Sequence, residues 1–165
     1  MKLSYSIFPS PVGWLAIVRR HGKIFALFQS SKDSGEVEKR LLSRYPGAQK
    51  RGLSARIQFF LKNFFEGKKT PKLRLDLSGE SPFRKRVLQR VQRIPTGEVR
   101  SYEWLAKETG SPGGARACGQ ALHDNPLPIL IPCHRVILKS GKKGGFIWGN
   151  GVKERLLRLE TQSKK

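Results

Sequence analysis

Short apolar or alternating segments, each about as long as a β-strand, open the chain. They cover residues 3–8, 14–18 and 24–28, and the second and third are separated by the polar run Arg20-His21-Gly22-Lys23. Alternating segments bounded by polar and glycine-containing turns are typical of strands. The pattern therefore predicts a strand meander.

Apolar residues then recur at helical spacing. One helix is expected at residues 36–45, and a stronger one at residues 53–65, whose apolar face carries Ile57, Phe60, Leu61, Phe64 and Phe65. Gly67 ends this helix, and the alternation in residues 73–77 predicts a short strand. The composition changes after that strand. We therefore place a domain boundary at residues 78–80, between an N-terminal domain of residues 1–78 and a C-terminal domain of residues 79–165.

The second half carries repeated helix starts. Ser81-Pro82 combines an N-cap residue with proline at the first helical position, and an apolar stripe follows up to Pro95. Ser101 can cap a second helix through residue 107, and Ser111-Pro112 predicts the start of a third. Two short helices joined by a tight turn with glycine suggest a helix-turn-helix.

The last part of the chain mixes a strand, a loop and a helix. The apolar run at residues 129–138 predicts a strand that Pro132-Cys133-His134-Arg135 interrupts, residues 140–145 predict a loop, and residues 152–160 predict a final helix. The expected fold class is α+β. A small N-terminal α/β domain with a strand meander precedes a mostly helical C-terminal domain that contains the helix-turn-helix.

Charge narrows the choice of partner. The 165 residues include 33 Lys plus Arg and 12 Asp plus Glu, for a formal charge of +21. Such a surface attracts polyanions, which favours nucleic acid or an anionic membrane. No run of about 18 apolar residues occurs, and the first ten residues lack the apolar stretch of a signal peptide. We therefore expect a cytoplasmic protein with no membrane partner.

Cysteine and histidine are scarce. The chain has two cysteines and three histidines and no CxxC pair, so the sequence supports neither a disulfide framework nor a zinc finger. We predict no metal and no cofactor. Each thiol is then available for other chemistry.

Residues 113–121, Gly-Gly-Ala-Arg-Ala-Cys-Gly-Gln-Ala, are unusual for a helix, because glycine costs about 1 kcal/mol relative to alanine there. Close packing against a neighbouring helix is one explanation. The other is that small side chains let the helix approach a DNA minor groove, which is about 6 Å wide. Arg116 would then be the one long side chain on that surface. Cys118 shares a stripe with Ala115 and Leu122, which predicts a core position.

Cys133 has neighbours that can activate a thiol. A cysteine is mostly protonated at neutral pH, and an adjacent base or cation raises its thiolate fraction. His134 and Arg135 could supply both, although the alternative is an inert buried cysteine. Glu160 shares a helix face with Val152 and Leu156. It either orients an imidazole in a Cys-His-acid array or lies in water at a frayed helix end.

Several of these segments together resemble one known family, the O6-alkylguanine-DNA alkyltransferases, also called methylated-DNA–protein-cysteine methyltransferases. The order and spacing of the motifs agree across residues 81–160, and the first 78 residues are compatible with the family's variable N-terminal domain. The matching segments are Pro95-Thr96-Gly97-Glu98-Val99-Arg100-Ser101-Tyr102, Ala115-Arg116-Ala117, Asn125-Pro126, Ile131-Pro132-Cys133-His134-Arg135-Val136 and Lys153-Glu154-Arg155-Leu156-Leu157 with Glu160.

The resemblance implies repair of double-stranded DNA by stoichiometric, irreversible transfer of an alkyl group from O6 of guanine to Cys133, with O4 of thymine as a further substrate to be tested. It implies that Glu160 orients His134, which takes the Cys133 proton through a water. Asn125 would stabilise the bend that builds the pocket. Tyr102 would donate a proton to the guanine ring as the alkyl group leaves.

The resemblance also implies how DNA binds. Arg116 would enter the duplex and replace the extruded base, and base extrusion costs a few kcal/mol. The other residues implied at the DNA surface are Ser101, Ala115, Ala117 and Gly119, and those implied at the substrate pocket are Tyr102, Val136, Phe146, Ile147 and Trp148. Phe146 stands where tyrosine is common, and Trp148 should narrow the pocket. We expect a monomer, nucleoid-associated in a prokaryote, whose binding on DNA is either independent or cooperative.

Two other classes of function compete with this hypothesis. A non-catalytic relative would hold the flipped lesion without transferring the group, but such relatives lack the nucleophilic cysteine. A cysteine hydrolase would also use a Cys-His-acid array. It would turn over repeatedly and would need neither the small-residue helix nor the +21 charge.

Overall fold

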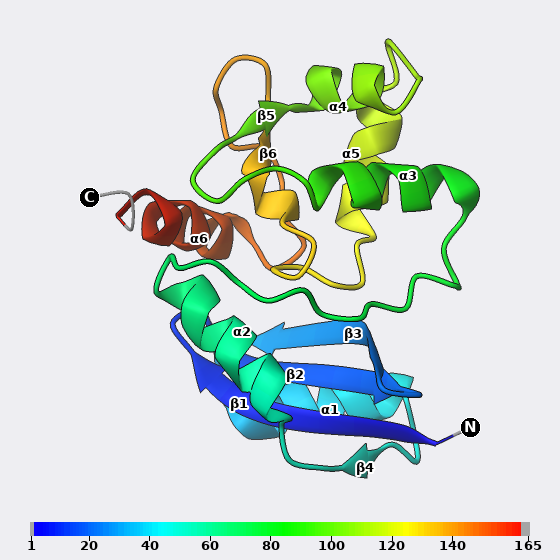
Figure 1. Ribbon diagram of the computed structural model, residues 1–165, viewed down its shortest axis with the longest axis vertical. Coiled ribbons are helices and arrows are strands. Elements are labelled where there is room, and N and C mark those ends of the chain that lie inside the picture. The colour runs from blue at the N-terminus through cyan, green and yellow to red at the C-terminus, as the bar shows by residue number, and fades with distance from the viewer. Residues whose placement is uncertain (1, 163–165) are drawn as a thin grey trace. The chain divides into compact units, whose positions relative to one another are not determined.

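The computed structural model describes residues 2–162 and divides the chain into two compact units, residues 1–77 and residues 78–165. Figure 1 shows a strand-rich first unit and a mostly helical second unit, which is the α+β class expected from the sequence.

The first unit is built on a four-stranded sheet. Strands β1 (Leu3–Ser10), β2 (Gly13–Arg20) and β3 (Lys23–Ser30) form the predicted antiparallel meander. The short strand β4 (Gln49–Lys50), which the pattern did not predict, pairs in parallel with β1. The resulting order is β3-β2-β1-β4.

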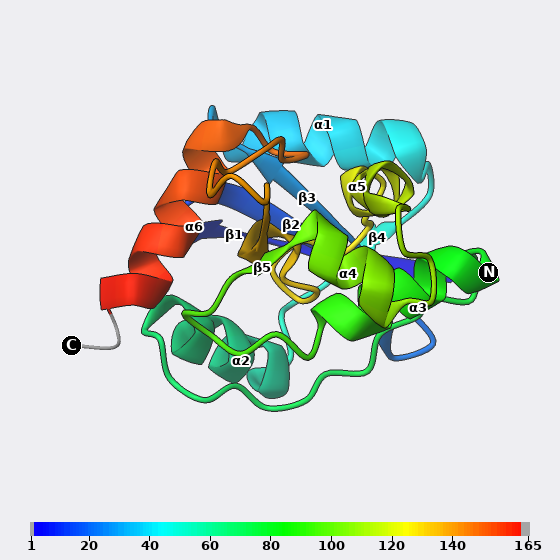
Figure 2. The ribbon, with the colours of Figure 1, turned by 90° about the horizontal axis from the view of Figure 1, so that it is seen from above.

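Two helices lie on opposite faces of this sheet (Figures 1 and 2). Helix α1 (Ser34–Arg44) begins where the Asp33 carboxylate accepts a hydrogen bond from the Glu36 amide at 2.8 Å. Helix α2 (Ala55–Phe65) begins two residues later than predicted, capped by Ser54. A core on the α1 side consists of buried Tyr5, Ala16, Val18, Ala26, Val37 and Leu41.

The strand predicted at residues 73–77 is wrong. The segment makes one isolated parallel bridge, in which the Ile24 amide donates to the Arg74 carbonyl at 2.9 Å and the Asp76 amide donates to the Ile24 carbonyl at 2.8 Å. The alternating side chains of residues 73–77 predicted a strand, but the segment does not continue this backbone pairing along β3.

The second unit begins with the predicted capped helix. Helix α3 (Pro82–Val91) starts where the Ser81 hydroxyl accepts from the Arg84 amide at 3.2 Å. A two-residue strand, β5 (Arg100–Ser101), leads into α4 (Tyr102–Glu108), which Ser101 caps by accepting from the Trp104 amide at 3.0 Å. Both N-cap predictions are confirmed. Helix α3, however, ends at Val91, four residues before Pro95.

The helix start predicted at Ser111-Pro112 is wrong. Helix α5 (Ala115–His123) begins three residues later, because the Ser111 carbonyl accepts from the Gly114 amide at 2.8 Å and closes a turn instead. Gly113 in that turn has a φ of +85°, and a Cβ on Gly114 would lie 2.8 Å from the Ser111 carbonyl oxygen. The two glycines therefore serve the turn rather than a helix interior.

The long strand predicted at residues 129–138 is also wrong. Ile129 has a φ of 74°, which no strand tolerates, and residues Cys133–Arg135 form a 3-10 turn, η1. Only β6 (Val136–Ile137) is extended, paired in parallel with β5. The predicted loop follows, and the final helix α6 (Asn150–Gln162) is longer at both ends than expected.

Candidate active site

Helices α4 and α5 pack against each other across the turn at residues 109–114, in the predicted helix-turn-helix arrangement. Thr109 ends α4 by donating its hydroxyl to the Leu105 carbonyl at 2.8 Å. Its oxygen also lies 3.8 Å from the Cys118 sulfur, which is fully buried. Cys118 is thus a core residue of this pair of helices.

A pocket of about 410 Å³ opens beside α5. Cys133 lies in its wall, 4% exposed, together with residues of α4, α5 and the loop after β6. Of the five residues that the resemblance implies at the substrate pocket, Tyr102, Phe146 and Ile147 line it. The complete lining is Tyr102, Glu103, Ala115, Arg116, Gly119, Leu122, His123, Cys133, Leu138, Gly144, Gly145, Phe146 and Ile147.

The loop that carries Cys133 is held from inside by Asn125. This side chain is 1% exposed, donates to the Ile131 carbonyl at 3.1 Å and accepts from the Leu127 amide at 3.0 Å. The Cys133 amide in turn donates to the Ile131 carbonyl at 2.7 Å. Asn125 therefore fixes the bend around Ile129 and, with it, the start of the 3-10 turn.

Behind the thiol lies a buried cluster of charged and polar groups. His134 Nε2 and Glu160 Oε1 are 2.7 Å apart, and both side chains are almost fully buried. Arg135 donates to the same carboxylate through Nη2 at 2.7 Å and through Nε, and its Nη1 donates to the Ile94 carbonyl at 2.6 Å. The Gly97 amide adds a further donor to Glu160 at 3.2 Å.

The cluster sets the protonation of each group. Burial alone would raise the pKa of Glu160, but the hydrogen bonds from His134 and Arg135 outweigh it and lower the value to about 2. Burial lowers the pKa of His134 despite the carboxylate beside it. Glu160 is therefore an anion and His134 a neutral imidazole at pH 7. The carboxylate accepts the Nε2 proton, which leaves the lone pair of the ring on Nδ1.

The thiol itself is protonated in this state. Burial raises the pKa of Cys133 to about 11, although a hydrogen bond from Asn125 and the charge of Lys153 act in the opposite direction.

Comparison of the chain with known proteins identifies its family. Residues 82–162 match the family described as "6-O-methylguanine DNA methyltransferase, DNA binding domain". A methylated-DNA–protein-cysteine methyltransferase from Mycobacterium tuberculosis is 36% identical over 159 residues, which cover 96% of this chain and 92% of that protein. The constitutive protein of that name from Bacillus subtilis is 36% identical over 163 residues, which cover 98% and 97%. The chain belongs to the methylated-DNA–protein-cysteine methyltransferase family.

The fold agrees with this membership. The crystal structure of Mycobacterium tuberculosis OGT in complex with DNA matches with a TM-score of 0.83 and 34% identity, covering 97% of this chain and 94% of that one. The family resemblance read from the sequence is thus confirmed. As a methylated-DNA–protein-cysteine methyltransferase, the chain transfers an alkyl group from DNA to one of its own cysteines and has DNA as its partner.

Lys153 is the member of the site that sequence reasoning missed. Its side chain is fully buried, and Nζ donates to the Val136 carbonyl at 2.7 Å and to the Gly145 carbonyl at 3.3 Å. Burial lowers its pKa to about 8, against the effect of Cys133 nearby. The buried face of α6 is Lys153, Leu156 and Glu160, whereas Val152, which the sequence analysis placed on it, is only half-buried. A lysine three residues before Leu156 and seven before Glu160 was the available signal.

The ring of Tyr102 lies close to two glycines of the pocket lining. A Cβ on Gly119 would lie 3.8 Å from Tyr102 Cε1, and one on Gly144 would lie 3.4 Å from Cε2. Lys153 Nζ lies 5.9 Å from the ring centroid. Burial, together with Cys133, raises the pKa of Tyr102, so its hydroxyl keeps its proton at pH 7.

The remaining residues implied by resemblance divide into some that line the pocket and some that do not. Val136 is fully buried in β6, and Trp148 contacts Phe146 edge to face with centroids 6.0 Å apart. Neither is among the lining residues. On α5, Ala117 is exposed, whereas Ala115, Arg116 and Gly119 reach the pocket. Ser101 is occupied in capping α4.

Residues 2–162 lack two features. This part of the chain contains no group of three or more His, Cys, Asp or Glu side chains placed to hold a metal ion. None of its helices combines the length and the apolar character needed to cross a membrane.

Proposed function

We propose that Cys133 receives the alkyl group from O6 of a guanine that leaves the DNA duplex and enters the 410 Å³ pocket. The observation that carries this proposal is the position of Cys133 in the pocket wall, directly followed along the chain by the buried His134–Glu160 pair. Cys118 has the opposite surroundings, because it faces Thr109 in the helix core and is absent from the pocket lining.

The proton of the thiol goes to His134 in this proposal. As sulfur attacks the alkyl carbon, a carbon–sulfur bond forms and the bond from that carbon to guanine O6 breaks. The Cys133 proton moves to Nδ1 of the neutral His134, with a water as relay, and the Glu160 anion stabilises the resulting imidazolium. Tyr102 donates its hydroxyl proton to the guanine ring, so the leaving group is a neutral guanine that stays attached to the DNA. The proton held by His134 then returns through solvent to the Tyr102 phenolate.

Lys153 acts as a positioning residue in the same step. Its ammonium donates hydrogen bonds to the backbone of β6 and to that of Gly145. These bonds fix the position of the pocket loop relative to the strand that follows Cys133. A buried positive charge near Cys133 also favours the thiolate that forms during transfer.

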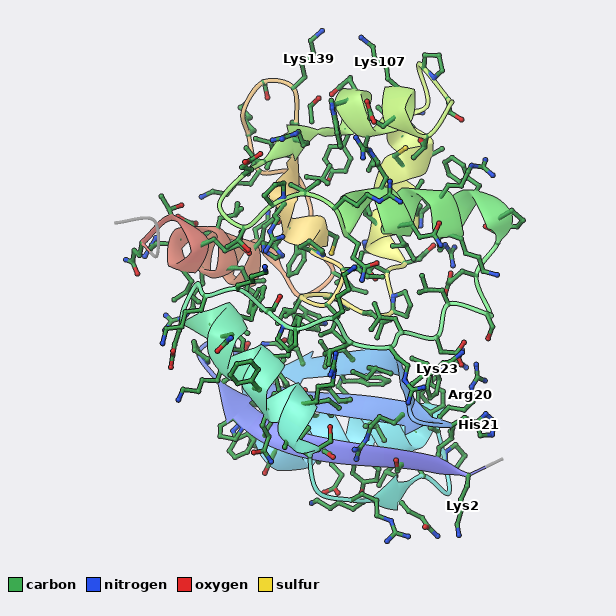
Figure 3. The ribbon with its side chains drawn as sticks, in the orientation of Figure 1. Lys2, Arg20, His21, Lys23, Lys107 and Lys139 are labelled. Atoms are coloured by element: carbon green, nitrogen blue, oxygen red, sulfur yellow. The ribbon has the colours of Figure 1, made fainter. Side chains whose placement is uncertain are left out.

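The DNA-facing surface of the proposal is α5. Arg116 is exposed at the pocket and can occupy the space of the extruded base, while Ala115 and Gly119 keep the helix narrow there. Lys107 and Lys139 project from one end of the second unit in Figure 3. Lys107 lies one helical turn after the pocket residue Glu103, and Lys139 directly follows the pocket residue Leu138. Both can contact phosphates beside the pocket. We infer that the protein acts as a monomer in the nucleoid-containing compartment, and titration of duplexes of increasing length tests whether several molecules bind DNA cooperatively.

Intact mass after incubation with a methylated duplex tests the proposal. We expect each chain to gain the mass of one methylene, permanently and once. Cys133→Ala should gain nothing yet still bind DNA, whereas Cys118→Ala should react like the unaltered chain. An alkyl group mapped to Cys118 contradicts the assignment. Unchanged mass with tight lesion binding would indicate a binder, and repeated ester turnover would indicate a hydrolase.

The range of adducts follows from the pocket walls. Phe146 and Ile147 line the pocket and Trp148 supports Phe146 from outside the lining, so Trp148 does not itself narrow the entrance. We propose that O6-methylguanine is the main substrate and O4-alkylthymine a weaker one. Competition between the two methylated duplexes for a limiting amount of protein measures this preference.

A further inference from the structure

A second hollow of about 410 Å³ lies in the first unit, far along the chain from Cys133. It is formed by the start of β1, the end of β2, the β2–β3 turn and the segment around β4. Its lining contains no carboxylate and consists of Lys2, Leu3, Ser4, Arg19, His21, Gly22, Gln49 and Arg51. We call this hollow the basic groove. Figure 3 shows Lys2, Arg20, His21 and Lys23 gathered at this end of the sheet.

Strand register explains why polar side chains collect here. Ser4 pairs with Arg19 on β2 and with Gln49 on β4, so these three side chains share one face of the sheet. The neighbouring residue Tyr5 points to the opposite face, where it belongs to the core under α1. The basic groove therefore lies on the sheet face turned away from α1.

Arg19 is held in place by neutral acceptors, and no carboxylate of residues 2–162 pairs with it. Its Nη2 donates to the Ser6 hydroxyl at 2.8 Å and to the Gly52 carbonyl at 3.0 Å, while its Nε is buried with no hydrogen-bond partner among the described residues. Burial lowers the pKa of Arg19. A guanidinium fixed by neutral acceptors is already oriented for an anion, so little conformational freedom is lost when one binds.

The carboxylates near this end of the sheet are engaged elsewhere. Arg20, which follows Arg19, binds Asp76 at 2.6 Å, and Lys50, which precedes Arg51, binds Glu38 at 3.2 Å. The Arg51 guanidinium donates to the amide oxygen of Gln49, at 3.1 Å. Among the described residues, no ion pair is formed by Lys2, Arg19, His21 or Arg51. The positive charge of the groove is thus uncompensated within this part of the chain.

We propose that the basic groove binds a phosphate group of a nucleic-acid backbone. Arginine forks and lysine ammonium groups with neutral amide and hydroxyl neighbours are the donors that phosphate oxygens accept from. Among its side chains only Leu3 is apolar, which does not suit an apolar ligand, and the surrounding charge favours a polyanion over an isolated ion. The groove lies in the first unit, so it is a DNA contact additional to α5 and the pocket.

Salt dependence of duplex binding by the full chain tests this contact. Each phosphate contact contributes about 0.9 to the slope of log affinity against log salt, or about 3.5-fold in affinity between 50 and 200 mM. Lys2→Gln with Arg51→Gln should reduce that slope by about 0.9 or more. The matched control, Lys39→Gln with Arg44→Gln, removes the same charge from exposed positions of α1. It should leave the slope unchanged.

NMR chemical shifts of the backbone amides, measured on the full chain, distinguish a phosphate of nucleic acid from free inorganic phosphate as the ligand. Saturable shifts at Ser4, Gln49 and Arg51 with an unmodified duplex, and only weak shifts with inorganic phosphate, support a nucleic-acid contact. Equal saturation by inorganic phosphate at low concentration would overturn it in favour of a free-phosphate site. Absence of shifts, or equal salt slopes for the two double variants, would overturn the site altogether. Alkyl transfer from a free methylated base should be unchanged in every variant, so failure here leaves the assignment of Cys133 intact.

Discussion

The two units of the chain handle charge in opposite ways. In the first unit the core under α1 is apolar apart from the Tyr5 hydroxyl, and acidic side chains such as Glu38 form their ion pairs at the surface. In the second unit His134, Arg135, Lys153 and Glu160 are all buried. Burying ionised groups costs several kcal/mol each unless partners compensate, and it seldom improves stability over an apolar core. We propose that the second unit keeps these groups for the chemistry of alkyl transfer.

Removing the buried carboxylate should give the largest effect. Glu160→Gln leaves Arg135 buried without its anion, which should lower the free energy of unfolding by about 3 to 5 kcal/mol and slow transfer strongly. Glu38→Gln, its surface counterpart in the first unit, should cost about 1 kcal/mol or less. Urea unfolding and single-turnover rates measure both. Similar losses for the two variants would remove the distinction between the units.

The same carboxylate predicts an acid limit of stability. Its pKa is lowered to about 2 in the folded protein, against about 4.3 in an unfolded chain. The folded state therefore gains stability from Glu160 above pH 4.3 and loses it as the pH falls toward 2. Unfolding followed across this range should show a smaller decline for Glu160→Gln than for the unaltered chain.

Lys153 offers the next test, because a structural role and an electrostatic role differ in pH dependence. Lys153→Met removes the charge near Cys133, so the pKa of the thiol should rise further. In a plot of transfer rate against pH, the rise in rate should therefore move to higher pH. Lys153→Arg should restore part of the original profile. Lys50→Met, at an exposed ion pair of the first unit, should leave the profile unchanged. A slower rate with an unmoved profile would restrict Lys153 to holding the loop.

Arg116 separates base extrusion from chemistry. Arg116→Ala should slow transfer from a methylated duplex about tenfold or more, since extrusion costs a few kcal/mol that the arginine helps to offset. Transfer from a free methylated base needs no extrusion and should change little. Arg86→Ala, at another exposed arginine of the second unit, serves as the control. Equal losses on both substrates would contradict the role of Arg116.

The smallest expected effect concerns Gly119. Its added Cβ would meet Tyr102 at 3.8 Å, which is ordinary van der Waals contact. Gly119→Ala should therefore stabilise α5 by up to about 1 kcal/mol and leave transfer from a free base nearly unchanged. Gly114→Ala, whose Cβ would lie 2.8 Å from the Ser111 carbonyl oxygen, should instead destabilise the second unit. Thermal unfolding of the two variants compares them directly.

Sequence patterns predicted best where one simple period decides the structure. The three meander strands and the caps at Ser81 and Ser101 depend on local spacing and local hydrogen bonds, and they are confirmed. The segment at residues 129–138 is apolar because it is buried, yet its backbone follows the Asn125 side chain and a positive φ at Ile129. Apolar content alone cannot distinguish a buried strand from a buried loop.

The site could be predicted only as far as its residues are adjacent or match a motif. Cys133 and His134 are consecutive, so their proximity is evident in the sequence, whereas the contact of His134 with Glu160 spans 26 positions. Lys153 was missed because a lysine on a surface-type helix ordinarily lies in solvent. Its burial depends on two backbone carbonyls, at Val136 and Gly145, that no side-chain pattern reveals.

The protonated state of the buried thiol has a consequence for how long each molecule lasts. Oxidants and small electrophiles attack the thiolate, and a thiol that is 4% exposed with a pKa of about 11 offers them little of it. A protein that can react only once would otherwise be lost to peroxide or to reactive metabolites before it met damaged DNA. If Cys133 is the reacting thiol, as we propose, its burial protects it from these side reactions and preserves the single transfer for a base bound in the pocket.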